Sequence, residues 1–240
     1  GGVLFENNAG CNLSCLGSGR AERPLLSLKM DTDQVRYVSR QLATFDVERI
    51  CFFSLGEPFM SRNILDEMRI IREELPRTVV YTSTNGVLVN TDDKRLAALM
   101  MDDVIFSVDG CSQETLVKYQ VGSDFEAAYE NLCRLVDFRD QAGHPGPRIT
   151  WKYVVFRWND RAEHVARTLE LAHRARVDVM EFVFTLNPFW GISPRFHVAS
   201  HWRRLGPIVN KRRRITLRPE PAARVAAEGR PHAERAGSLL

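Results

Sequence analysis

Short apolar runs alternate with amphipathic segments along most of the chain. Runs rich in Val, Ile and Phe, such as "RICFFSL" (49–55) and "DVMEFVF" (178–184), are typical of buried strands. Segments such as "RNILDEMRIIREEL" (62–75) repeat apolar residues at the spacing of one helix face. The pattern therefore predicts a series of strand–helix units.

The alternation can be followed for six units. Strands, with the turns that follow them, are predicted at 2–7, 49–55, 78–86, 103–110, 148–156 and 178–184. Helices are predicted at 31–45, 62–75, 92–100, 124–143 and 160–175. Asp31 or Thr32 suits the N-cap of the first helix, and Gly143 suits the end of the fourth.

These units favour an α/β fold. Continuous apolar strands with helices between them indicate a parallel sheet, and six units are too few for an eight-fold barrel. We expect a partial (βα)6 barrel of parallel strands, with a doubly wound sheet as the alternative. Residues 1–190 would form this core. Residues 191–240, rich in Arg, Pro and Ala, would form an irregular C-terminal extension, basic and partly disordered.

Composition narrows the class of protein. Of 240 residues, 44% are hydrophobic and 26% charged, as in soluble globular proteins, and no apolar run approaches the ~20 residues of a membrane span. A net charge of +3 is too small to indicate nucleic acid, and the run 211–214 is interpreted as a solvated basic face. Five cysteines without a disulfide-scaffold pattern favour a reduced, cytoplasmic setting. The chain begins without Met, so we expect an excised fragment.

Polar, glycine and cysteine residues recur just after successive strands. Cys11 and Cys15 follow the first strand, "SLGEPF" (54–59) the second, "TSTNG" (82–86) the third and "SVDGC" (107–111) the fourth. Each motif alone also fits an ordinary turn or a pair of core cysteines. Because parallel strands end at one rim, where ligands bind in such folds, their joint placement predicts a site.

The ordered set "CNLSC", "SLGEPF", "TSTNG", "IFSVDG…TLVKYQVGSDFEAAYENL" and "WKYVVFRWND" resembles the radical S-adenosylmethionine (AdoMet) enzymes. It looks closest to the branch that often carries a further C-terminal iron–sulfur domain of SPASM or twitch type. The resemblance implies a [4Fe–4S] cluster held by three thiolates of a CxxxCxxC loop, with one iron open to AdoMet. It also implies reductive cleavage of AdoMet to a 5′-deoxyadenosyl radical that abstracts hydrogen from substrate.

The resemblance assigns a role to each motif. Cys11 and Cys15 would be metal ligands, and Ser18 stands at the third ligand position. The residues implied for AdoMet are Gly56, Glu57, Pro58, Thr84, Asn85, Ser107, Asp109 and Lys152. Glu57 and its backbone would meet the methionyl ammonium, with Leu55 where the family's first glycine usually stands. Gln120 stands where the family often has arginine, which weakens the case for an arginine anchor there.

Ser18 is the largest departure from the family pattern. A serine hydroxyl is a harder and much less acidic ligand than a thiol, so we expect a weak, oxygen-labile or absent cluster. Ser18 can be a variant that cripples an active enzyme, or the mark of a degenerate member that keeps the fold. Alternatively, another thiol completes the site, for which Cys111 at the same rim is the candidate; Cys51 and Cys133 fit the core.

The sequence thus predicts a radical SAM enzyme that acts on a peptide or small-molecule substrate with an electron donor such as a flavodoxin or ferredoxin. No cysteine follows Cys133, so the auxiliary iron–sulfur domain is expected to be absent or truncated. One alternative is a non-catalytic binding protein of the same fold. Another is an α/β protein that binds a different nucleotide, against which stands the lack of a glycine-rich phosphate loop.

Overall fold

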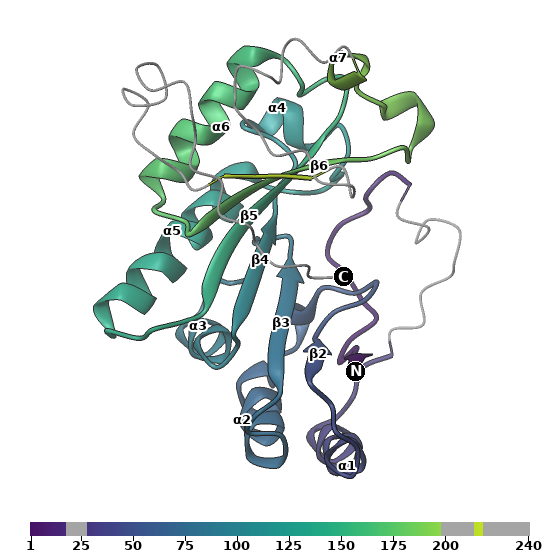
Figure 1. Ribbon diagram of the computed structural model, residues 1–240, viewed down its shortest axis with the longest axis vertical. Coiled ribbons are helices and arrows are strands. Elements are labelled where there is room, and N and C mark those ends of the chain that lie inside the picture. Colours follow the sequence, from purple (N-terminus) through teal and green to yellow (C-terminus); the bar gives the residue numbers. More distant parts are fainter. Residues whose placement is uncertain (18–27, 198–213, 218–240) are drawn as a thin grey trace.

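The computed structural model describes residues 1–17, 28–197 and 214–217. Seven strands form one sheet in the order β1-β2-β3-β4-β5-β6-β7 (Figure 1). They are β1 (Gly2–Leu4), β2 (Arg49–Cys51), β3 (Val79–Thr84), β4 (Asp103–Ser107), β5 (Arg148–Val155), β6 (Val179–Phe184) and β7 (Arg214–Leu217). Strands β1 to β6 are parallel, and β7 is antiparallel to β6. The strands thus neighbour one another in chain order, as in a barrel.

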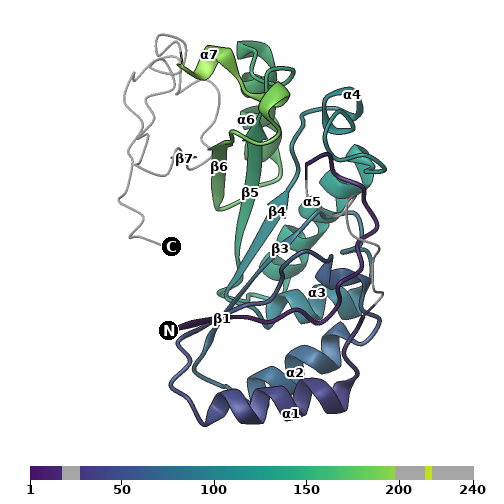
Figure 2. The same cartoon turned by 90° about the vertical axis from the view of Figure 1, so that its right-hand side faces the viewer.

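Helices connect the parallel strands and cover one side of the sheet. They are α1 (Thr32–Ala43), α2 (Ile64–Glu74), α3 (Asp92–Leu99), α4 (Gln113–Leu116), α5 (Phe125–Gln141), α6 (Ala162–Arg174) and α7 (Pro194–His197), with 3-10 helices η1 (Pro58–Met60) and η2 (Phe189–Gly191). Figure 2 shows the sheet curving, with α1, α2, α3 and α5 along its outer side. This arrangement confirms the predicted partial barrel.

Burial alternates along the strands and separates the two faces of the sheet. Phe106, Trp151 and Phe182 are fully buried on the face that packs against the helices. Their neighbours Ser107 and Lys152, which point to the opposite face, are only partly buried. The inner face of the curved sheet is therefore less covered than the outer face, which carries the apolar core.

Local signals account for several helix ends. Asp31 caps α1, and a reciprocal bond from the Asp31 backbone to the Gln34 side chain completes a capping box. Gly143 follows α5 with a φ of 60°, in the left-handed region that glycine adopts readily. All six predicted strands and five predicted helices are present, and their observed bounds lie within the predicted ranges.

The C-terminal part of the chain differs from the prediction in one respect. Residues 214–217, inside the predicted irregular extension, form β7 and pair with β6 from Met180 to Val183. Of the basic run, 211–213 lies outside the described residues. No helix in the parts of the chain that the structure describes has the length and apolar character needed to cross a membrane.

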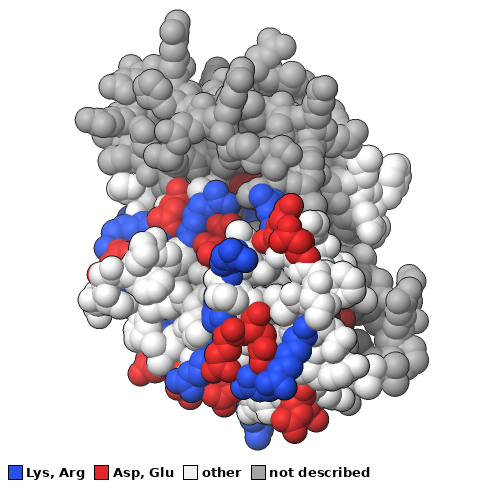
Figure 3. Space-filling model, turned by 60° about the horizontal axis from the view of Figure 1, so that its bottom comes forward, with Lys and Arg blue, Asp and Glu red and all other residues white. Residues whose placement is uncertain are grey.

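Charges of both signs are interspersed on the outer helices. Arg36 of α1 pairs with Glu73 and Glu74 of α2, and Arg72 pairs with Asp102. On the face shown in Figure 3, blue and red side chains alternate and form no field of one sign. Mixed charge of this kind lacks the basic stripe that binds phosphate backbones.

Candidate functional site at the rim of the sheet

The loop after β1 runs across the C-terminal ends of several strands. Ser14 N donates to Val121 O at 3.0 Å, and Leu16 N donates to Tyr119 O at 2.9 Å. Asn187 Nδ2, from the segment after β6, donates to Gly17 O at 3.2 Å. Cys15 therefore lies between two backbone hydrogen bonds that fix the loop against the segment after β4.

Cys11, at the other end of this loop, lies at the end of β3. Asn85 Nδ2 lies 3.9 Å from Cys11 Sγ and donates to Asn12 Oδ1 at 2.8 Å. Cys11 and Cys15 are both partly buried, and neither forms a disulfide. Burial raises the pKa of Cys15 to about 11, and the nearby charge of Asp109 adds to the shift.

These thiols fit part of a cluster site. Two cysteine sulfurs on one rim loop are soft donors of the kind that iron–sulfur clusters need. Ser18, the third predicted position, lies outside the described residues. Within the described ranges no group of three Cys, His, Asp or Glu residues is placed to hold a metal. Cys111 is buried in the core, where its backbone bonds Thr115 and Arg167.

The "GEP" loop packs directly on the backbone of the loop after β1, which carries the two cysteines. A Cβ at Gly56 would lie 1.8 Å from Asn8 O, so only glycine fits. Glu6 Oε1 accepts the N–H groups of Leu55 and Gly56, at 2.7 and 2.8 Å. The Leu55 side chain is 51% exposed. A side chain is thus tolerated at 55, where the family usually has glycine, but not at 56.

The Glu57 carboxylate points into the protein. Oε1 accepts Phe59 N at 3.1 Å and Thr84 Oγ1 at 2.7 Å, and Oε2 accepts Asn85 N at 2.8 Å. Burial raises the pKa of Glu57, and these three donors oppose that shift. Glu57 and Thr84, both predicted AdoMet residues, therefore bond each other and join the β2 loop to β3.

The segment after β4 is held by a network of amide side chains. Gln120 accepts Asp109 N at 2.9 Å and donates to Ser107 O at 2.8 Å. Asn159 Nδ2 donates to Asp109 O at 2.8 Å, and Asp109 Oδ1 accepts Val154 N at 2.8 Å. Gln120 thus fixes the backbone at Ser107 and Asp109. The sequence did not predict this positioning role; it indicated only that glutamine stands where the family often has arginine.

The Asp109 carboxyl is almost completely buried, with 2% of the residue exposed. Burial raises its pKa to about 6, while the positive charge of Lys152 opposes the shift. Lys152 on β5 is paired in register with Ser107 on β4 and with Glu181 on β6. These three residues form a polar row on the inner face of the sheet. Glu181 was not among the site residues predicted from the sequence.

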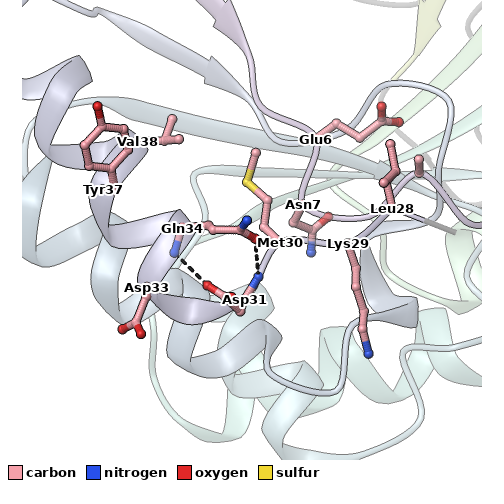
Figure 4. Close-up of a pocket in the computed structure, with 11 residues that line it drawn as sticks. Glu6, Asn7, Leu28, Lys29, Met30, Asp31, Asp33, Gln34, Tyr37 and Val38 are labelled. Atoms are coloured by element: carbon pink, nitrogen blue, oxygen red, sulfur yellow. Dashed lines mark hydrogen bonds between the residues drawn. The ribbon is translucent and has the colours of Figure 1, made fainter. Parts of the chain in front are cut away.

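A cavity of about 740 Å³ lies beside β1, apart from the two rim thiols. Figure 4 shows its lining, which runs from the chain after β1 to the first turns of α1. The lining residues are Glu6, Asn7, Ala9, Leu28, Lys29, Met30, Asp31, Asp33, Gln34, Tyr37 and Val38. None of the predicted site residues lines it. Two lining residues link it to the "GEP" loop: Glu6 Oε1 accepts Gly56 N, and Asn7 Nδ2 donates to Pro58 O at 3.4 Å.

A curated protein resembles part of this chain. The GTP 3′,8-cyclase of Chlorobaculum tepidum is 26% identical to this chain over 134 residues. The match covers 56% of this chain and 40% of the cyclase. The chain therefore matches less than half the length of this relative.

Solved structures of similar fold cover more of the chain. Native anSMEcpe with bound AdoMet and Cp18Cys peptide matches with a TM-score of 0.55 and 15% identity, over 80% of this chain and 54% of that one. Coproporphyrinogen III oxidase (HemN) from Escherichia coli matches with a TM-score of 0.54 and 13% identity, over 94% and 57%. At these identities the likeness is one of fold.

The sequence also matches the profile of the Radical SAM superfamily over residues 8–140. That span covers more than half of the 240 residues and includes the cysteine loop, the "GEP" loop and the ends of β3 and β4. The chain therefore belongs to the radical SAM superfamily, a family of enzymes that bind a [4Fe–4S] cluster and AdoMet.

Proposed function

We propose that this chain is the core of an enzyme that reductively cleaves AdoMet and removes a hydrogen atom from a peptide or small-molecule substrate. The observation that carries the proposal is the meeting of the Cys11–Cys15 loop with the end of β3 and with the segment after β4 at one rim. When bound, a [4Fe–4S] cluster supplies the electron for that cleavage.

Cys11 and Cys15 would hold two of the irons, with position 18 as the third ligand position. Gly56, Glu57 and Pro58 would receive the methionyl ammonium of AdoMet. Because the Glu57 carboxylate already accepts three internal donors, we assign this contact to the loop backbone and to the remaining acceptor capacity of Oε2. Thr84 would hold Glu57 in place.

The other assigned residues lie along the rim and the inner face. Asn85 would order the cysteine loop through Asn12, and Ser107 and Asp109 would face the ribose or carboxylate of AdoMet. Lys152, on the inner face beside Ser107, would contact the carboxylate of AdoMet or the substrate. The buried Gln120 bonds support this arrangement because they fix the Ser107–Asp109 backbone.

We place the chain in the SPASM or twitch-like branch, with residues 1–190 as the core and 191–240 as an extension. The ordered motifs "CNLSC", "GEP", "TSTNG" and "SVDG" support this assignment. A one-electron donor such as a flavodoxin or ferredoxin would be its partner in the cytoplasm. The second candidate function is a binding protein of the same fold without radical chemistry, which Ser18 favours.

The two functions are separated by reconstitution with iron and sulfide without oxygen. Iron content, low-temperature EPR with and without AdoMet, and 5′-deoxyadenosine formation are measured for the unmodified protein and for Ser18→Cys. We expect Ser18→Cys to gain a full cluster and form 5′-deoxyadenosine. If it gains neither, the enzyme proposal fails. If both proteins hold a full cluster, Ser18 is not disabling.

Cysteine variants provide the matched controls. Cys11→Ala and Cys15→Ala in the Ser18→Cys background should lose the cluster. Cys133→Ala, in the middle of α5, should keep it. Cys111→Ala should also keep it, because Cys111 is 2% exposed and packed in the core. Loss of the cluster in Cys111→Ala, with the fold intact by circular dichroism, would identify Cys111 as a ligand.

A further inference from the structure

The side-chain amide of Asn85 lies against the sulfur of Cys11. Asn85 Nδ2 is 3.9 Å from Cys11 Sγ, at the long end for a hydrogen bond to sulfur, and the backbone N–H of Leu13 donates to the same sulfur at 3.5 Å. Asn85 is only 7% exposed, so little water reaches the amide to screen its charge distribution. Cys11 therefore has two N–H groups directed at its sulfur, and one of them comes from the end of β3.

The other partners of this amide set its orientation. Asn85 Oδ1 accepts the backbone N–H of Val87 at 3.1 Å, and Nδ2 donates to Asn12 Oδ1 at 2.8 Å. Because a backbone N–H can only donate, the amide oxygen must face Val87 and the NH2 group must face the cysteine loop. The NH2 group carries two hydrogens, so one bonds Asn12 and the other is left to point at Cys11.

The turn that carries Asn85 is held from two sides. Glu57 Oε2 accepts the Asn85 backbone N–H at 2.8 Å. On the other side, Asn131 Nδ2 of α5 donates to the carbonyl oxygens of Gly86 and Val87 at 3.0 and 2.9 Å. Gly86 has a φ of 82°, which glycine adopts without strain. The Asn85 amide is therefore fixed by the fold itself, as a residue that tunes a metal ligand must be.

We propose that Asn85 tunes the reduction potential of the cluster, by donating a hydrogen bond to the sulfur of Cys11. This inference rests on the proposed function, because it needs a cluster bound at Cys11. A reduced cluster carries one more negative charge than an oxidised one, and an N–H directed at a ligand sulfur stabilises that charge. The Asn85 amide therefore raises the potential, which hydrogen bonds to the sulfurs help to set. This role is distinct from the AdoMet contact that the resemblance implies for Asn85.

A redox titration followed by low-temperature EPR tests this role, without AdoMet and in the reconstituted Ser18→Cys background. Asn85→Ala removes the donor, so we expect the equilibrium constant for one-electron reduction of the cluster to fall by about tenfold, a fall of about 59 mV in potential. Asn85→Asp keeps an acceptor for Val87 N but turns an oxygen toward Cys11, so it should lower the potential further. Parent potentials in both variants would overturn the proposal.

Asn12→Asp is the matched control for charge. Asn12 is next to Cys11 in the chain, so an aspartate there also adds a negative charge beside the cluster, while its Oδ1 still accepts the Asn85 N–H. We expect Asn12→Asp to lower the potential less than Asn85→Asp does. An equal fall in the two variants, with no fall in Asn85→Ala, would mean that charge alone acts and would overturn the proposal. A loss of AdoMet affinity in Asn85→Ala at the parent potential would do so too, and would assign Asn85 to AdoMet.

A second measurement needs no cluster. In the NMR spectrum of the isotope-labelled, metal-free protein, the Asn85 side-chain proton that faces the sulfur should shift in Cys11→Ala and stay in place in Cys15→Ala. An unchanged signal in Cys11→Ala would overturn the contact, whether or not a cluster assembles. Circular dichroism checks that each variant folds, and if Asn85→Ala does not, Asn85→Asp and Asn12→Asp carry the comparison. If Ser18→Cys assembles no cluster, the proposed function fails and the tuning role with it; a cluster at an unchanged potential refutes the tuning role alone.

Discussion

Glu57 Oε2 accepts the backbone N–H of Asn85 at 2.8 Å, and this bond joins the loop after β2 to the end of β3. Asn85 in turn bonds Asn12 beside Cys11. The buried carboxylate is thus two hydrogen bonds away from the cysteine loop. Glu57, which we expect to bind AdoMet, therefore also holds the loop after β2 and the end of β3 in place.

Glu57→Gln should destabilise the fold. The carboxylate accepts three donors, so a glutamine amide must present an NH2 group to at least one N–H or O–H donor. We expect the free energy of unfolding to fall by about 2–3 kcal/mol, as measured by urea titration. Glu163→Gln, whose side chain is 69% exposed, is the control and should change it little. An equal stability for both variants would contradict the inward role of Glu57.

Asp109 should make stability fall as pH rises from about 4 to 6. Burial raises its pKa from 3.8 to about 6, so in this window the folded protein binds the proton that the unfolded chain has released. The full shift corresponds to about 3 kcal/mol of lost stability. Asp109→Asn keeps an acceptor for Val154 N but cannot titrate. Urea titrations across this range should show the parent losing stability relative to the variant, and parallel curves would refute the assignment.

Gly56→Ala should disrupt the rim. The added Cβ would meet backbone atoms, at 1.8 Å from Asn8 O and 2.8 Å from Gly10 O, and neither can rotate away. We expect a loss of about 3 kcal/mol or more, or a displaced loop that no longer binds AdoMet. Gly2→Ala is the matched control, since its Cβ would find its nearest neighbour at 3.9 Å. Thermal unfolding and equilibrium dialysis with labelled AdoMet distinguish these outcomes.

Gln120→Glu tests the positioning role of the side-chain amide. A glutamate keeps an acceptor for Asp109 N but faces the Ser107 carbonyl with an oxygen instead of an N–H. We expect weaker AdoMet binding and a loss of about 1–3 kcal/mol of stability, because a buried carbonyl loses its donor. Gln113→Glu, on α4, is the control for AdoMet binding, because it makes the same change from amide to acid at a residue that is not assigned to the site. AdoMet affinity equal to that of the parent would mean that the Ser107–Asp109 backbone needs no such support.

The sequence predicted the layout of the sheet because the relevant signals are local. The run at 103–107 and the helical period at 125–141 appear in the structure as β4 and α5. That the cysteine loop lies at the end of β3 and against the segment after β4 followed from parallel strand direction alone. β7 escaped prediction because a four-residue strand has no periodicity of its own, and its pairing with β6 is a long-range choice.

The orientation of individual side chains was harder to predict. A glutamate after a strand signals a charge at the rim, but whether it faces a ligand or the interior depends on donors far away in the chain. Thr84 and Asn85 supply those donors to Glu57. The support from Gln120 and Asn159 depends in the same way on contacts 11 and 50 residues distant.

The bond between Gly17 O and Asn187 Nδ2 spans 170 residues. A ribosome adds about 5–20 residues per second, so the cysteine loop leaves it roughly 10–35 s before its last described partner. Until Asn187 has been added, the cysteine loop lacks the contact that holds its Gly17 end, so its thiols are more open to oxygen and to stray metal ions than in the folded protein. Correct metal loading in the cell therefore has to wait until the segment after β6 has been synthesised or depend on protection of the nascent chain.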